Sequence, residues 1–91
     1  MNLFYLFKDF FFQKKISYVQ NQQDFEESLE KLKSTNVLAV DTEFIWRNTY
    51  FPKLSLIQIS TENIIYIFDC MLLDVSKLRC IFENKNIKKI F

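Results

Sequence analysis

A continuous apolar run, Val37 to Val40, leads directly into two acidic residues, Asp41 and Glu43, which one residue separates. Uninterrupted apolar runs with β-branched ends are typical of a strand that is covered on both faces of a sheet. Successive side chains of a strand point to opposite faces, so Asp41 and Glu43 are expected to project from one face at the carboxyl end of the strand. Thr42, between them, is expected to point into the packing. This segment therefore predicts a buried strand with two carboxylates on one face at its carboxyl end.

The two carboxylates allow two interpretations. Neighbouring acids repel one another, and a divalent cation such as Mg²⁺ or Mn²⁺ supplies the compensating charge where they bind one together. Alternatively, an Asp-x-Glu pattern after a strand consists of two solvated acids at the start of a loop. The pair alone is compatible with both interpretations.

Composition excludes several classes of function. With no Gly, the chain has neither a P-loop nor a dinucleotide-binding fingerprint, and with no His it has no Ser-His or Cys-His catalytic pair. The formal net charge of +1 does not indicate a nucleic-acid or a membrane partner. Cys70 and Cys80 lack the spacing of a zinc site and indicate reduced, partly buried thiols in a cytoplasmic protein. At 91 residues the chain forms one small domain at most.

The amino-terminal segment, Met1 to Phe12, is rich in Phe, and Lys8 and Asp9 interrupt its apolar run. It is far shorter than the roughly 20 residues that a membrane span needs. An extension or an amphipathic helix that packs on the domain is expected here, and membrane-surface anchoring is the alternative. We therefore divide the chain into an extension, residues 1–15, and a domain, residues 16–91.

The domain alternates between strand and helix patterns. Gln22 to Ser34 is expected to be an amphipathic helix, with Asn21 as its N-cap and Asp24 in its first turn. A second helix is expected after Asp74, which would cap it. The apolar stripe of the first helix consists of Phe25, Leu29 and Leu32.

Strands are expected at residues 16–19, 37–40, 54–60, 64–68 and 87–91. In the strand 54–60, Leu54, Leu56, Gln58 and Ser60 are expected on one face and Ser55, Ile57 and Ile59 on the other. These patterns indicate an α/β fold with a mixed sheet and flanking helices.

Two motifs together resemble the ribonuclease D group of 3′–5′ exonucleases, which belongs to the DEDD exonuclease superfamily. The first exonuclease motif of that group, D-T-E-F, stands here at Asp41 to Phe44. The downstream pattern Tyr-x-Pro-x-Leu-x-Leu-Ile-Gln stands at Tyr50 to Gln58. The resemblance covers residues 16–91 and implies a ribonuclease H-like fold, here an incomplete one. It also implies two-metal hydrolysis of phosphodiester bonds at RNA 3′ ends, with precursors of the transfer RNA type as substrates.

The resemblance assigns roles to particular residues. Asp41 would help to hold both Mg²⁺ or Mn²⁺ ions, and Glu43 would ligate one ion and orient the attacking water. Phe44, Trp46 and Arg47 are candidates for contact with the nucleic acid, although core packing for Phe44 and plain surface placement for the other two are equally good interpretations.

The same resemblance implies that part of the site is missing. The second and third motifs of the superfamily supply two more Asp residues and a Tyr or His, and they lie beyond the point that Phe91 reaches. The resemblance gives neither Asp69 nor Asp74 a catalytic role. The chain is therefore expected to be a fragment that is inactive alone, or that needs a second polypeptide. A non-catalytic remnant, or a domain that binds a partner or nucleic acid, is the alternative.

Overall fold

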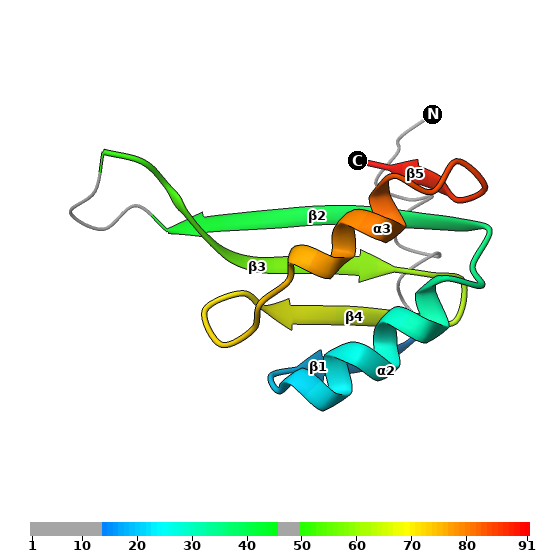
Figure 1. Cartoon of the computed structure of the whole chain (residues 1–91), viewed down its shortest axis with the longest axis horizontal. Coiled ribbons are helices and arrows are strands. Elements are labelled where there is room, and N and C mark those ends of the chain that lie inside the picture. The colour runs from blue at the N-terminus through cyan, green and yellow to red at the C-terminus, as the bar shows by residue number, and fades with distance from the viewer. Residues whose placement is uncertain (1–13, 46–49) are drawn as a thin grey trace.

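A computed structural model describes residues 14–45 and 50–91 of the chain. Its elements form one five-stranded mixed sheet with two helices and a short 3₁₀ helix (Figure 1). The predicted α/β class is therefore confirmed. In chain order the elements are β1 (Lys15–Val19), α2 (Gln22–Leu32), β2 (Val37–Ile45), β3 (Lys53–Ser60), β4 (Ile64–Asp69), η1 (Ser76–Leu78), α3 (Arg79–Phe82) and β5 (Lys88–Ile90).

The strands lie side by side in the order β1-β4-β3-β2-β5. β2, β3 and β4 form an antiparallel meander, whereas β1 runs parallel to β4 and β5 runs parallel to β2. Parallel neighbours require a crossover connection. α2 follows β1 and the η1–α3 segment precedes β5, so both helices lie in such connections.

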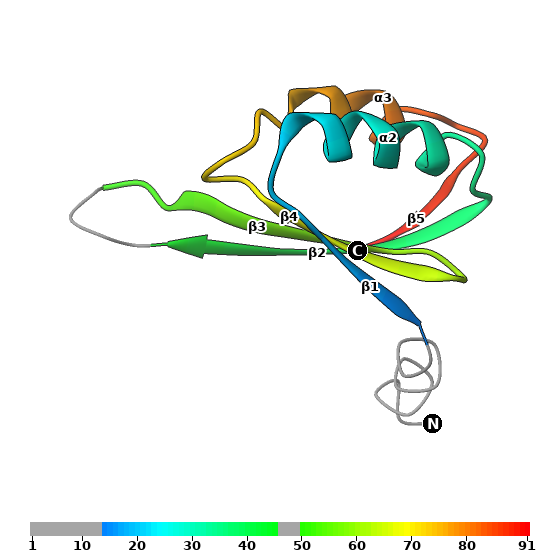
Figure 2. The ribbon, with the colours of Figure 1, turned by 90° about the horizontal axis from the view of Figure 1, so that it is seen from below.

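Both helices lie against the same face of the sheet (Figure 2). The core fills the space between them and the sheet, and it includes the whole predicted stripe of α2. Phe25 of α2 meets Phe68 of β4 edge to face, with ring centroids 5.5 Å apart. The largest fully buried side chains are Phe25, Phe68, Leu32, Leu38, Ile59, Leu78 and Ile81.

We call the sheet face that is turned away from α2 and α3 the acid face, because strand alternation and register place Asp41 and Glu43 on it. The acid face includes Ile16, Tyr18, Asp41, Glu43, Leu56, Gln58, Ile67 and Asp69. Leu38, Ala39 and Val40 are all buried, so β2 is buried on both faces at this point, as its apolar run predicts.

α2 begins where its capping residues predict. The side chain of Asn21 accepts a hydrogen bond of 2.9 Å from the backbone N–H of Asp24, and the side-chain amide of Asn21 donates to the Asp24 carboxylate at 3.0 Å. The first bond satisfies a backbone N–H that has no partner within the helix, and the second links two exposed side chains of the cap. The helix ends at Leu32, two residues before the predicted Ser34.

The predicted second helix is shorter and tighter than a regular α-helix. Asp74 accepts a hydrogen bond of 3.0 Å from the backbone N–H of Ser76, which starts the 3₁₀ helix η1. A single α-helical turn, α3, follows and ends at Phe82. Asp74 thus stabilises the start of this segment, as predicted, although Val75 occupies the N-cap position of η1.

β2 and β3 form a hairpin that projects beyond the rest of the molecule (Figure 1). The register between these strands shifts between Glu43 and Phe44, so that Ser55 has no partner on β2. This bulge reverses the alternation at Leu54, which packs against the core instead of sharing a face with Leu56. The predicted common face of Leu54 and Leu56 is therefore wrong.

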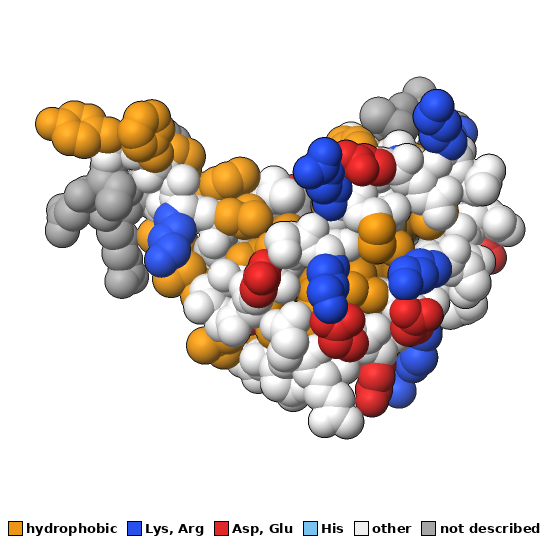
Figure 3. All heavy atoms as spheres, in the orientation of Figure 1, with side chains coloured by type: hydrophobic (Ala, Val, Ile, Leu, Met, Phe, Trp, Pro, Cys, Tyr) orange, Lys and Arg blue, Asp and Glu red, His pale blue; other side chains and the backbone are white. Residues whose placement is uncertain are grey.

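The projecting end of the hairpin carries exposed apolar side chains (Figure 3). They include Tyr50 and Phe51, whose side chains are 97% and 81% exposed. Over the helices, by contrast, positive and negative side chains alternate, which agrees with the predicted solvated face of α2.

Both cysteines are free, and Cys80 is exposed, not partly buried as predicted. None of the helices in the described part of the chain is long and apolar enough to cross a membrane. The Phe-rich segment, with its predicted helix, lies outside the described residues.

Candidate active site

Asp41 and Glu43 occupy two positions of β2 that face the same way. In the antiparallel ladder with β3, Asp41 is paired with Gln58 and Glu43 with Leu56. The intervening pair, Thr42 and Ile57, points to the other face. The structure thus confirms that one face of β2 presents both carboxylates.

Both acids are exposed, and their hydrogen bonding differs. Oδ1 of Asp41 accepts a hydrogen bond of 2.9 Å from the backbone N–H of Thr42, which holds the carboxylate in one orientation. Oδ2 of Asp41 and both carboxylate oxygens of Glu43 have no hydrogen-bond or ion-pair partner within residues 14–45 and 50–91. Three carboxylate oxygens are therefore open to a ligand from solvent.

The acids lie inside a strand and not after one. β2 continues past the predicted end at Val40 to Ile45, because β3 pairs with it as far as Lys53. Asp is uncommon in strands, which is why the sequence places the strand end before Asp41. Thr42 is exposed, so its predicted burial is also wrong. The longer strand fixes the backbone on both sides of the acid pair.

The three candidates for nucleic-acid contact have different outcomes. Phe44 is 52% exposed, which is inconsistent with a place in the core. Strand alternation puts it on the face opposite Glu43, so a contact between Phe44 and nucleic acid would be made on the other side of the hairpin from the acid pair. Its role stays a prediction. Trp46 and Arg47 lie outside the described residues.

Carboxylate oxygens are hard ligands of the kind that Mg²⁺ and Mn²⁺ prefer, so the chemistry of the acid pair fits such an ion. Within the described residues, however, no group of three or more acidic, His or Cys side chains is close enough to hold a metal ion. Asp69 and Asp74 accept hydrogen bonds from the backbone N–H groups of Met71 and Ser76. The described part of the chain therefore offers two ligands and no complete cage.

Gln58 is a further neighbour of the acid pair, and no role was predicted for it. It is paired with Asp41 across the hairpin, on the acid face, and its side chain is half-buried. An amide side chain there can donate a hydrogen bond to a carboxylate or to a bound group. The sequence does contain a signal for this position. If residues 54–60 are aligned against residues 39–45 as an antiparallel hairpin, strand alternation places Gln58 on the same face as Asp41.

Comparison with known families gives this site its context. The family model described as "3′–5′ exonuclease" matches residues 16–91, which is most of the chain and includes all five strands except the first residue of β1. The chain belongs to the 3′–5′ exonuclease family.

Relatives within this family are ribonucleases D. Ribonuclease D of Desulfotalea psychrophila is 32% identical over 79 residues, and that of Acidiphilium cryptum is 33% identical over 64 residues. These matches cover 85% and 68% of this chain but only 21% and 16% of the two relatives. The chain thus spans about a fifth of the length of the relatives it matches.

Solved structures of the same group confirm the fold. The catalytic core of RRP6 from Trypanosoma brucei superimposes with a TM-score of 0.78 at 26% identity, over 87% of this chain and 23% of that one. Escherichia coli RNase D, an exoribonuclease involved in structured RNA processing, gives a TM-score of 0.74 at 26% identity, over 82% and 20% of the two chains. The mixed sheet and its helices are therefore part of a ribonuclease H-like 3′–5′ exonuclease fold.

Proposed function

We propose that residues 16–91 are the part of a ribonuclease D-like 3′–5′ exoribonuclease that carries its first two metal ligands. The observation that carries this proposal is the placement of Asp41 and Glu43, exposed on one face of β2, in a chain of the 3′–5′ exonuclease family. Their open oxygens are the donors that a Mg²⁺ or Mn²⁺ site of this kind needs.

The residues of this chain would bind the divalent cations and hold the carboxylate ligands in a fixed orientation. The backbone N–H of Thr42 fixes the Asp41 carboxylate, and pairing of β2 with β3 on both sides of Asp41 and Glu43 keeps the two acids on the same face. When bound, a pair of divalent cations activates the attacking water and stabilises charge on the leaving oxygen. The proposed substrate is an RNA 3′ end, of the transfer RNA precursor type that the resemblance implies, and the proposed location is the cytoplasm.

The isolated chain is expected to be inactive, because the described residues supply only two ligands. The proposal requires further ligands from outside the described residues, in the same or in a second polypeptide. Purified chain incubated with Mg²⁺ or Mn²⁺ and a 3′-labelled RNA is expected to leave the RNA intact. Progressive shortening that disappears in Asp41→Ala would contradict the proposed inactivity.

The catalytic part of the proposal needs a positive test. Residues 16–91 can replace the matching segment of Escherichia coli RNase D, which restores the chain outside the match. The chimera is expected to shorten 3′-labelled RNA with a divalent cation, and Asp41→Asn is expected to abolish this activity. A folded chimera that is inactive, or whose activity survives Asp41→Asn, would exclude the proposed role of Asp41.

The exposed apolar residues favour a second candidate, a non-catalytic domain that binds a partner. Ile16 and Tyr18 are 62% and 52% exposed on the acid face, next to the half-buried Ile67. Exposed apolar patches on a small domain commonly mark interaction surfaces. Under this alternative, Tyr18→Ser would weaken self-association or partner capture, whereas the chimera with Escherichia coli RNase D would show no activity that depends on Asp41.

A further inference from the structure

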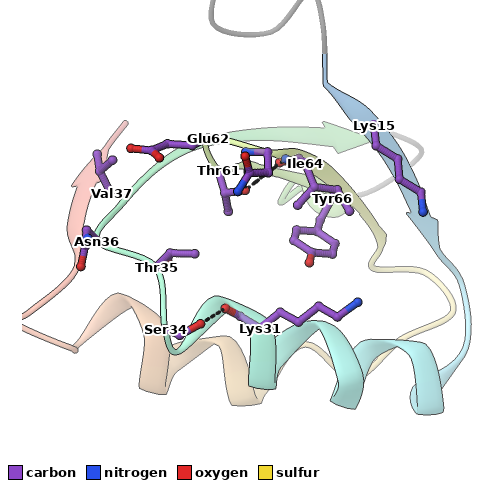
Figure 4. A pocket seen from close by; sticks show the side chains of 11 residues that line it. Lys15, Lys31, Ser34, Thr35, Asn36, Val37, Thr61, Glu62, Ile64 and Tyr66 are labelled. Atoms are coloured by element: carbon purple, nitrogen blue, oxygen red, sulfur yellow. Dashed lines mark hydrogen bonds between the residues drawn. The ribbon is translucent and has the colours of Figure 1, made fainter.

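A cavity of about 480 Å³ lies on the helix side of the sheet, away from the acid face. The last turn of α2 and the segment after it form one wall, and β1, β4 and the β3–β4 turn form the other (Figure 4). Its volume falls in the range of roughly 300–1,000 Å³ that is usual for small-molecule sites. Its lining combines polar and apolar residues from segments that are far apart in the sequence.

Tyr66 is a buried residue whose hydroxyl is directed into this cavity. The residue is only 4% exposed, and its ring stacks on Phe68 with centroids 5.8 Å apart. Its hydroxyl points from the sheet toward α2 (Figure 4) and makes no hydrogen bond to any residue in the described part of the chain. Burial raises the pKa of Tyr66, so the hydroxyl keeps its proton and remains a donor.

Two ammonium groups line the same cavity from opposite walls. Lys15 comes from β1 and Lys31 from α2 (Figure 4), and neither takes part in an ion pair within the described residues. Glu62 is the one carboxylate among the lining residues, and it interacts electrostatically with Lys14. The lining therefore carries a net positive charge of one, from two lysines and one glutamate.

The Ser and Thr hydroxyl groups around the cavity already have partners. Ser34 and Thr35 donate to the backbone carbonyls of Lys31 and Leu32 at 3.0 and 2.8 Å, and Thr61 donates to that of Ile64 at 3.2 Å. Their protons are therefore engaged. The donors left to a ligand are the ammonium groups of Lys15 and Lys31 and the hydroxyl of Tyr66.

We propose that this cavity binds a small phosphate-bearing molecule, with Lys15 and Lys31 as counter-ions and the Tyr66 hydroxyl as a hydrogen-bond donor to the phosphate. A phosphate monoester carries about 1.5 to 2 negative charges at pH 7 and three strong acceptor oxygens, which matches two ammonium groups and one hydroxyl. The cavity is larger than a phosphate alone needs, so the rest of the molecule would occupy the space beside Val37 and Ile64.

This site is independent of the proposed exonuclease function. Tyr66 points to the helix side of the sheet, whereas Asp41 lies on the acid face. Ligand binding in the cavity therefore does not depend on the acid pair, and Asp41→Asn is expected to leave it unchanged. Failure of either proposal can be recognised separately.

The test is a titration of the full 91-residue chain, followed by the backbone amide signals of each residue. The probes are inorganic phosphate, adenosine 5′-monophosphate and, as the uncharged control, adenosine. We expect shifts at the cavity residues with the two phosphate probes and none with adenosine. Stronger binding of the nucleotide than of inorganic phosphate would identify an organic phosphate as the ligand, and the reverse would identify the free anion.

Three variants make the test specific. Lys31→Gln is expected to weaken binding about tenfold and Tyr66→Phe severalfold, since each removes one donor to a charged group. Tyr66→Phe keeps the core ring, and Lys31 is exposed, so both variants are expected to stay folded with dispersed spectra. Lys85→Gln, an exposed lysine outside the cavity lining, is the matched control and should have no effect. Absence of shifts at millimolar phosphate, or equal weakening in Lys85→Gln and Lys31→Gln, would overturn the proposal.

Discussion

Glu43 of β2 and Asp69 of β4 are both paired with Leu56, the β3 residue that lies between them, so the three side chains form one row across the acid face. The backbones of β2 and β4 are two strand spacings apart, about 9.5 Å. Side chains stand roughly perpendicular to a sheet, so the two carboxylates stay separated by a similar distance. Asp41 and Glu43 therefore form a pair to which Asp69 does not belong.

The separation of Asp69 from the acid pair can be tested by matched substitutions. Asp69→Asn keeps the oxygen that accepts from the backbone N–H of Met71 at 3.0 Å, so stability and metal binding should change little. Asp69→Ala removes this acceptor and is expected to lower the free energy of unfolding by about 0.5–1.5 kcal/mol. Urea unfolding and Mn²⁺ titration measure the two quantities. A loss of Mn²⁺ affinity in Asp69→Asn as large as in Asp41→Asn would show that Asp69 is a ligand.

The contact between Phe25 and Phe68 is expected to dominate the stability of the domain. Phe25 is fully buried, and truncating a buried Phe to Ala typically costs about 3–5 kcal/mol. Small domains have a total stability of about 5–15 kcal/mol, so Phe25→Ala should remove a large fraction of it and strongly lower the urea midpoint. Phe44→Ala, at a half-exposed position, is the control and should change the midpoint only slightly. Equal effects of both substitutions would contradict the assigned core.

The cap of α2 makes a smaller, separable contribution. Asn21→Ala removes the acceptor of the Asp24 N–H and should lower the free energy of unfolding by about 0.5–2 kcal/mol. Asn21→Ser keeps a neutral oxygen that can accept from this N–H and should recover most of the loss. Thermal or urea unfolding of the three proteins provides the measurement. If Asn21→Ser is as unstable as Asn21→Ala, the hydrogen bond to the Asp24 N–H is not the source of the stabilisation.

The ion pair between Glu26 and Lys77 predicts a dependence of stability on pH. It joins α2 to η1 with an N–O distance of 2.8 Å, and the hydrogen bond from Lys77 lowers the pKa of Glu26. A lowered carboxyl pKa in the folded state stabilises the fold above the unfolded-state pKa, about 4.3, and this contribution disappears as the pH falls through the lower folded-state pKa. Both side chains are solvated, so the effect is small and screened by salt.

The pH dependence can be isolated with one variant. The urea midpoint of the wild type should exceed that of Glu26→Gln near pH 6. The difference should decrease as the pH falls below about 4.3 and vanish below the folded-state pKa of Glu26. High salt should reduce the difference at pH 6. A difference that is constant from pH 6 to pH 3 would show that Glu26 acts through packing and not through its charge.

Local patterns predicted most elements, because each depends on residues that are close in the chain. The stripe Phe25, Leu29 and Leu32 and the cap at Asn21 define α2 almost to the residue. The shared face of Asp41 and Glu43 follows from strand alternation alone. These features need no knowledge of the distant parts of the fold.

Features that depend on pairing between segments were not predictable in the same way. β2 runs on through Asp41 because β3 supplies its hydrogen-bond partners, which overrides the low strand propensity of the acids. The bulge at Ser55 moves Leu54 to the core side although the polarity pattern is unbroken. The cavity below Tyr66 is built from several separate segments, so no single stretch of sequence contains its signal.

The central claim is that Asp41 and Glu43 bind a divalent cation, and paramagnetic broadening of the backbone amide signals by Mn²⁺ tests it most directly. Substoichiometric Mn²⁺ should broaden signals of residues 40–44 and of Gln58 first, and Asp41→Asn combined with Glu43→Gln should abolish this selectivity. Excess Mg²⁺ should compete for the same site. Broadening that spreads evenly over the exposed acids of α2, or that persists at β2 in the double variant, would contradict the claim.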